Sequence, residues 1–116
     1  MGAYTYIANL LEQIDIPSRG TLSRTVYADD SVKVVLFGFD AEQELSEHTA
    51  AVPAMLHFLQ GDARLTLGNE PLEVSAGAWV HMPAHLPHSL YAKTPVVMLL
   101  LLLKGVPRGE RYETPD

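Results

Sequence analysis

The stretch "GAWVHMPAHLPHSLYA", Gly77 to Ala92, contains three histidines and two short runs of strand-forming residues. Residues 78–82, "AWVHM", and 88–92, "HSLYA", are short apolar-rich runs of the strand type. The segment between them, "PAHLP", is bounded by prolines and predicts a loop. We therefore expect two strands, with one of the histidines, His88, at the start of the second.

Strand signals continue on both sides of this stretch. Further runs ended by Gly, Pro, Asp or Asn occupy residues 21–28, 32–39, 44–50, 53–60, 63–68, 72–76 and 96–103. About nine short strands at close, regular spacing are typical of an all-β sandwich or barrel. Residues 6–14 differ, because their apolar positions 7, 10, 11 and 14 have helical spacing and predict one short amphipathic N-terminal helix. With no second helical pattern, alternating β-α folds are disfavoured.

Composition limits the classes of protein to which the chain can belong. Its 116 residues predict a single domain, 1–116, with a core over about 21–103 and a loose tail at 104–116. The formal net charge of −6 disfavours partners such as nucleic acid or an anionic membrane surface. The absence of cysteine excludes disulfides, thiolate zinc sites and cysteine nucleophiles. The N-terminus lacks a signal-peptide pattern, so we expect a cytoplasmic protein.

Two segments carry chemically significant residues at fixed spacing. In the first, Glu42 to Gly61, His48 lies thirteen residues before Gly61. In the second, Gly77 is followed at fixed distances by Pro83 and His88. Their spacing, order and separation of fifteen residues, 62–76, resemble the two motifs of the cupin family, and in particular its small, single-domain bacterial members.

The resemblance implies a fold and a site. The implied fold is all-β, a double-stranded β-helix (cupin jelly-roll) barrel of the RmlC-like type, with the short N-terminal helix added. The implied metal ligands are His48 and His88, and the implied metal is one divalent ion of Fe, Ni, Mn or Zn. The family's other two ligand positions fall on Ala50 and Ala54, so water or a captured small ligand would have to complete the coordination shell.

Strand alternation predicts which side chains face the interior. With His48 inward, Glu44 and Ala50 share its face, although Glu44 lies too far along a regular strand to bind the same ion unless a bulge intervenes. His85 could turn from its loop toward the site or face solvent, whereas His57 and His81 fall on the outward face. The predicted ligand pocket comprises Glu44, Ala50, Ala54, Leu56, Phe58, Val80, Met82, His85 and Met98.

These residues leave more than one function open. A metal-dependent enzyme is one hypothesis, with dioxygenase, isomerase or cyclase chemistry implied only by the resemblance, so that enzymatic activity stays undecided. A metal-free module that binds a small organic molecule is the second, and a structural dimer without catalysis is the third. A homodimer is expected in each case, because Met55, Leu59 and Trp79 make the outward face apolar and residues 96–103 are apolar throughout.

Overall fold

The computed structural model describes residues 3–105, and the regular secondary structure there is almost entirely β-strand. The nine strands of this part of the chain are β1 (Thr21–Ala28), β2 (Val32–Phe39), β3 (Glu44–His48), β4 (Ala54–Gln60), β5 (Asp62–Leu67), β6 (Glu70–Ser75), β7 (Trp79–Met82), β8 (His88–Ala92) and β9 (Val96–Leu103). Each corresponds to one of the runs predicted from the sequence. The tail predicted over 104–116 lies, from residue 106 onward, outside the described residues.

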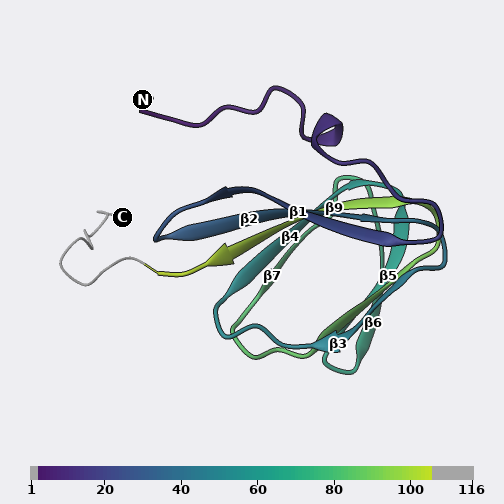
Figure 1. Cartoon of the computed structure of the whole chain (residues 1–116). Coiled ribbons are helices and arrows are strands. Elements are labelled where there is room, and N and C mark those ends of the chain that lie inside the picture. Colours follow the sequence, from purple (N-terminus) through teal and green to yellow (C-terminus); the bar gives the residue numbers. More distant parts are fainter. Residues whose placement is uncertain (1–2, 106–116) are drawn as a thin grey trace.

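The strands form two antiparallel sheets, which together give the predicted jelly roll (Figure 1). The five-stranded sheet has the order β1-β2-β9-β4-β7, and the four-stranded sheet has the order β3-β8-β5-β6. Strands far apart in the sequence are neighbours in both sheets, since β2 pairs with β9 and β3 pairs with β8. Because of these crossovers, the two segments that carry His48 and His88 become adjacent strands.

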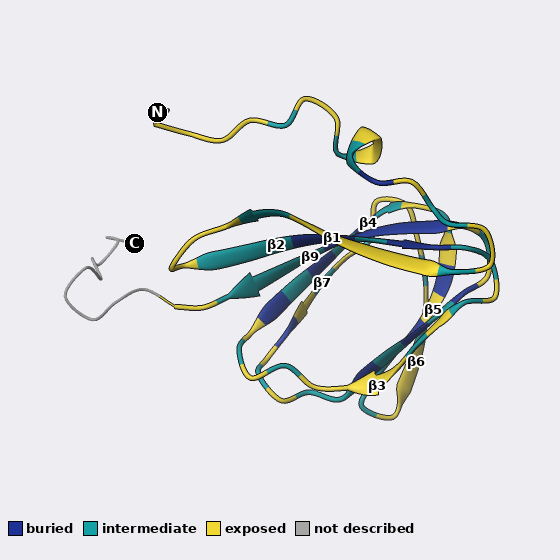
Figure 2. Ribbon diagram, in the orientation of Figure 1, coloured by how far each residue is buried: buried dark blue, intermediate teal, exposed yellow. Residues whose placement is uncertain are grey.

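The main core lies between the two sheets and is built from alternate residues of their strands. Figure 2 marks the buried residues of the strands in dark blue. Ala54, Leu56 and Phe58 of β4 are each no more than 2% exposed, whereas the residues between them are half-buried. Leu65 of β5 and Leu90 of β8 approach from the other sheet and are equally enclosed. The inward set predicted for β4 is therefore confirmed.

The N-terminal segment covers part of the outer face of the five-stranded sheet. Only Leu10–Gln13 is helical, as a single 3₁₀ turn capped by the Asn9 side chain, which accepts a hydrogen bond from Leu11 N at 3.1 Å. The longer amphipathic helix predicted over residues 6–14 is thus wrong in extent. So short a segment gains few helical hydrogen bonds, and Ile14 instead takes an extended conformation and packs on Leu36. Among the described residues, no helix is long and apolar enough to cross a membrane.

Candidate functional site

Two histidines stand opposite each other on adjacent strands of the four-stranded sheet. His48 ends β3 and His88 begins β8, and the two residues are direct partners in the antiparallel register. Their ring centroids are 4.2 Å apart, with the ring planes inclined at 59°. The fold therefore brings together the two histidines for which the sequence predicted a shared site.

The hydrogen bonds of both rings define which nitrogen is free. Nδ1 of His48 lies 2.8 Å from the backbone oxygen of Ser46, and Nδ1 of His88 lies 2.9 Å from that of Leu86. A carbonyl oxygen can only accept, so each Nδ1 carries the hydrogen and donates it. In the neutral imidazole, each Nε2 then keeps a lone pair that can bind a metal ion or accept a hydrogen bond.

The two histidines differ in their environment. His48 is exposed, whereas His88 is 8% exposed and is the one buried polar side chain in the described part of the chain. Burial lowers the pKa of His88 below its ordinary value, the hydrogen bond to Leu86 acts in the opposite direction, and the nearby His48 lowers the pKa further by charge repulsion. Burial thus favours the neutral, metal-competent form of His88.

The pair lies at an otherwise apolar pocket between the sheets. Besides His48 and His88, the pocket is lined by Phe37, Leu45, Leu56, Leu65, Ser89, Leu90, Met98 and Leu100. None of these lining residues is charged. The cavity volume is about 30 Å³, which is the space of roughly one water molecule. The pocket can therefore hold an ion or a water as it stands, but a larger ligand has to remain at its mouth or displace side chains.

The structure separates the predicted pocket residues into three groups. Leu56 and Met98 line the pocket beside the histidines. Four residues are part of, or pack against, the main core without lining this pocket, namely Ala54, Phe58, Val80 and Met82. The remaining three lie outside the core and the pocket, namely Glu44, Ala50 and His85.

Glu44 faces outward because of an irregularity in β3. The register with β8 shifts between Leu45 and His48, so that these two residues both face the pocket although they are three positions apart. Simple alternation fails across such a bulge. The alternation rule therefore placed Glu44 on the wrong face of the sheet. It also missed Leu45, which lines the pocket instead of Glu44. Leu90, also missed, lies two residues after His88, and alternation along β8 would have identified it.

The loop before β8 holds His85 away from the pocket. His85 is exposed and has a left-handed backbone conformation, with φ of 69°. Its backbone N donates to the oxygen of Ala50 at 2.7 Å, which ties the two loops together. The solvent-facing alternative for His85 is therefore the one observed, and Ala50 has a backbone role in the loop contact.

The other two histidines lie on the outer face of the five-stranded sheet, as alternation predicts. His57 of β4 pairs with Trp79, and His81 of β7 pairs with Met55. Neither is among the residues of the pocket. The stretch 77–92 therefore supplies one pocket histidine, one outer-face histidine and one loop histidine.

The two histidines can supply only part of the coordination shell of a divalent metal. Zinc–imidazole distances are about 2.0–2.1 Å, so an ion can bridge two nitrogens on rings as close as those of His48 and His88. No cluster of three or more His, Cys, Asp or Glu side chains within residues 3–105 could hold a metal ion. Two protein nitrogens would thus leave the remaining coordination positions to small molecules.

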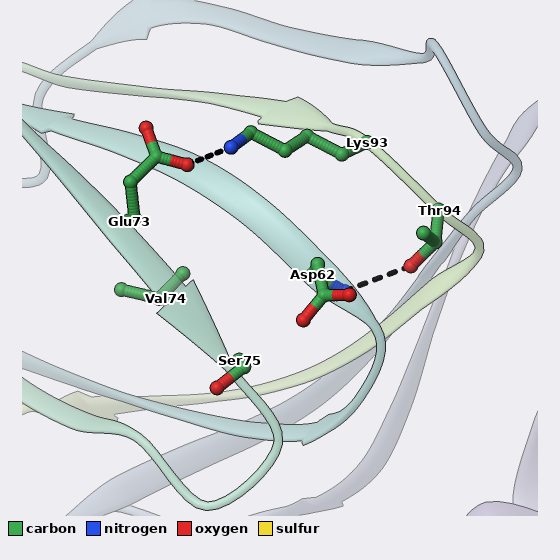
Figure 3. A pocket seen from close by; sticks show the side chains of 6 residues that line it. All are labelled: Asp62, Glu73, Val74, Ser75, Lys93 and Thr94. Atoms are coloured by element: carbon green, nitrogen blue, oxygen red, sulfur yellow. Dashed lines mark hydrogen bonds and ion pairs between the residues drawn. The ribbon is translucent and has the colours of Figure 1, made fainter.

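A second, larger hollow is polar and open. Figure 3 shows it at the ends of β5 and β6, where it is lined by Asp62, Glu73, Val74, Ser75, Lys93 and Thr94, with a volume of about 480 Å³. The carboxylate of Glu73 forms ion pairs with Arg64 and Lys93. Figure 3 shows the pair with Lys93 and the hydrogen bond that Asp62 N donates to the hydroxyl of Thr94 at 2.8 Å. Lys93 and Arg64 lower the pKa of Glu73 and satisfy its carboxylate within the protein. The apolar pocket with its two free nitrogens is the stronger candidate site.

The family model for the cupin domain matches residues 35–102, which include both histidines of the pocket. The chain belongs to the cupin family. This agrees with the two-sheet jelly roll and with the resemblance noted in the sequence. No curated protein matches the chain significantly.

Solved structures support the same assignment. A conserved protein of unknown function from Streptococcus pyogenes is 31% identical, with a TM-score of 0.79, and the match covers 90% of this chain and 91% of that one. A cupin superfamily protein from Desulfitobacterium hafniense is 25% identical, with a TM-score of 0.78 and coverage of 83% and 88%. An RmlC-like cupin from Desulfovibrio desulfuricans, 24% identical with a TM-score of 0.79, shares the fold over 89% of this chain and 100% of its own.

Proposed function

We propose that this cupin binds one divalent transition metal through Nε2 of His48 and Nε2 of His88, at the mouth of the apolar pocket. The observation that carries the proposal is that both Nδ1 atoms donate to backbone carbonyls while the rings lie 4.2 Å apart. Hydrogen bonds of this kind fix the tautomer and orientation of metal-binding histidines. When bound, the metal would supply a Lewis acid with open positions.

The donor type narrows the choice of metal. Imidazole nitrogens suit Zn, Ni and Fe, whereas Mn prefers carboxylate and other oxygen ligands. The nearest acidic side chains of β3, Glu44 and Glu47, are exposed and do not line the pocket. The site therefore favours Fe, Ni or Zn over Mn.

The same site would bind a small organic ligand on the metal. A divalent ion held by two neutral imidazoles has no carboxylate to balance its charge, and charge is costly next to the apolar walls formed by residues such as Leu56 and Leu100. An anionic group, such as a carboxylate, would neutralise the ion and complete its shell. The small volume favours a ligand whose bulk stays at the exposed, His48 side of the pocket.

Metal binding by untagged protein tests the proposal. Equilibrium dialysis against Zn²⁺ or Ni²⁺, followed by elemental analysis, should give up to one ion per chain. His48→Ala and His88→Ala should each abolish that ion, because one remaining imidazole is a weak ligand. His57→Ala and His81→Ala are matched controls and should retain it, since their side chains lie on the outer sheet face.

Two outcomes separate this proposal from its alternative. Metal retained by the double variant His48→Ala/His88→Ala would show that the ion binds elsewhere. A wild-type protein that binds no metal, but whose melting temperature rises with an apolar small molecule, would instead support a metal-free binding module. The cavity of about 30 Å³ favours the metal, because it is too small for an organic molecule without rearrangement.

A further inference from the structure

A polar hollow lies on the outer face of the four-stranded sheet, on the other side of that sheet from the histidine pocket. Its volume is about 380 Å³, and small-ligand sites usually have about 300–1,000 Å³. Leu65 and Leu90 point into the core, so the residues beside them on β5 and β8 face this hollow. The hollow, called here the outer groove, has a half-buried floor of Thr66, Ser89 and Tyr91 and an exposed rim that includes Glu44, Glu47 and Arg64.

The register places charged side chains of opposite sign on the two sides of Tyr91. Glu44 of β3 is the direct partner of Tyr91 on one side, and Arg64 of β5 is its direct partner on the other. Directly opposite residues share a face of the sheet, with Cβ atoms about 4.5–5.5 Å apart. The Cβ atoms of Glu44 and Arg64 are therefore about 9–11 Å apart, with the Tyr91 side chain between them.

The bulge in β3 adds a second carboxylate to the acidic side of the outer groove. In a regular strand, Glu44 and Glu47 would face opposite sides of the sheet, because they are three positions apart. The register shift between Leu45 and His48 instead brings both to the outer groove. Within residues 3–105, Glu73 is the acidic partner in both ion pairs. No basic side chain of that part of the chain therefore neutralises Glu44 or Glu47.

The basic side of the outer groove keeps a surplus of positive charge. Glu73 accepts a hydrogen bond from Nε of Arg64 at 3.0 Å and also pairs with Lys93, so one carboxylate balances two cations (Figure 3 shows the pair with Lys93). The guanidinium of Arg64 has further N–H donors on its two terminal nitrogens. The outer groove is thus net negative at β3 and net positive toward β5 and β6.

We propose that the outer groove binds a small zwitterion, a molecule with one ammonium and one carboxylate group, such as a free amino acid. The ligand carboxylate accepts hydrogen bonds from Arg64, whose planar guanidinium matches carboxylate geometry. The ammonium donates to Glu44 and Glu47, and the carbon chain between the two groups packs on Tyr91. A ligand with a single charge leaves one side of the groove unmatched.

The spacing of the charges favours a ligand whose two groups are several bonds apart. With the side-chain tips as far apart as their Cβ atoms, charge-assisted hydrogen bonds of about 2.7–2.9 Å at each end leave about 3–6 Å between the ligand's ammonium and carboxylate. An extended 4-aminobutyrate has a separation of this order. It is therefore the probe of choice, with butylamine and butyrate as analogues that each lack one of the two charges.

An NMR chemical-shift titration of metal-free protein tests the proposal. Metal must be removed because an amino acid could otherwise bind to an ion held by His48 and His88. The probe 4-aminobutyrate should bind with a dissociation constant of about 1 mM, and it should shift the backbone amides of β3 and β8 beside the groove. Butylamine and butyrate should each bind about five-fold more weakly or worse, since each loses one exposed charge contact.

Substitutions separate the two ends of the outer groove. Arg64→Gln should abolish the preference for 4-aminobutyrate over butylamine, whereas Glu44→Gln/Glu47→Gln should abolish the preference over butyrate. Glu12→Gln/Glu70→Gln is the matched control, because both residues are exposed and lie outside the groove, so the same change in net charge should leave binding unchanged. His48→Ala/His88→Ala should also leave it unchanged, which distinguishes this site from the proposed metal site.

Three outcomes would overturn the proposal. The first is equal affinity for 4-aminobutyrate, butylamine and butyrate. The second is the absence of any amide shift at about 20 mM 4-aminobutyrate. The third is binding that survives Arg64→Gln and Glu44→Gln/Glu47→Gln but is lost in His48→Ala/His88→Ala, because the probe would then occupy the histidine pocket.

Discussion

Replacing Gly61 by alanine should destabilise the protein far more than the same change at Gly77, although both glycines occupy cupin motif positions. Both have positive φ, of 90° at Gly61 and 97° at Gly77. They differ in their surroundings. A Cβ added at Gly61 would lie 2.1 Å from the backbone oxygen of Pro95, whereas one added at Gly77 would meet nothing within 4 Å.

The expected loss in free energy of unfolding has two contributions, the left-handed backbone conformation and the close contact made by an added Cβ. A non-glycine residue in a left-handed conformation costs about 1–2 kcal/mol. At Gly61 the backbone of the turn that contains Pro95 must also move, and comparable overpacking costs a further 1–3 kcal/mol or so. We expect the free energy of unfolding to fall by about 1–2 kcal/mol in Gly77→Ala and by about 2–5 kcal/mol in Gly61→Ala.

Urea unfolding of both variants and the wild type, followed by circular dichroism, measures the difference. If the protein is dimeric, all samples should be compared at one concentration, because association contributes to stability. Equal losses at the two sites would refute the reasoning, since they would show that the close approach to Pro95 costs nothing. A stabilised Gly61→Ala variant would contradict the backbone conformation itself.

Three further predictions concern the pocket. In metal-free protein, the free energy of unfolding should fall as the pH is lowered from about 7 to about 5, because the pKa of His88 is lowered in the folded state and the unfolded chain takes up the proton first. The His88→Leu variant should lose less of its free energy of unfolding over the same pH range, as measured by urea titrations at each pH. Bound metal should be released by a chelator and below about pH 6, since a protonated imidazole cannot bind it; elemental analysis after dialysis would detect retention. Leu56→Ala should cost about 2–5 kcal/mol in chemical unfolding, because Leu56 is 2% exposed; a loss below 1 kcal/mol would contradict the packing of the pocket wall.

The sequence alone determined the strands and the histidine pair. Short runs of strand-forming residues bounded by turn residues placed all nine strands, because both are local properties of the chain. The motif spacing selected His48 and His88 from five histidines, and strand alternation assigned His57 and His81 to the outer face. The fold class followed from the same local signals together with the order of the two motifs.

The tertiary structure decided the rest. The bulge between Leu45 and His48 depends on pairing with β8, so alternation within β3 could not reveal that Glu44 turns outward. The N-terminal segment lost most of its predicted helix because packing of Ile14 on the sheet outweighs weak local helical preference. The free Nε2 atoms, too, follow from backbone carbonyls that only the folded chain brings within hydrogen-bond distance of each ring.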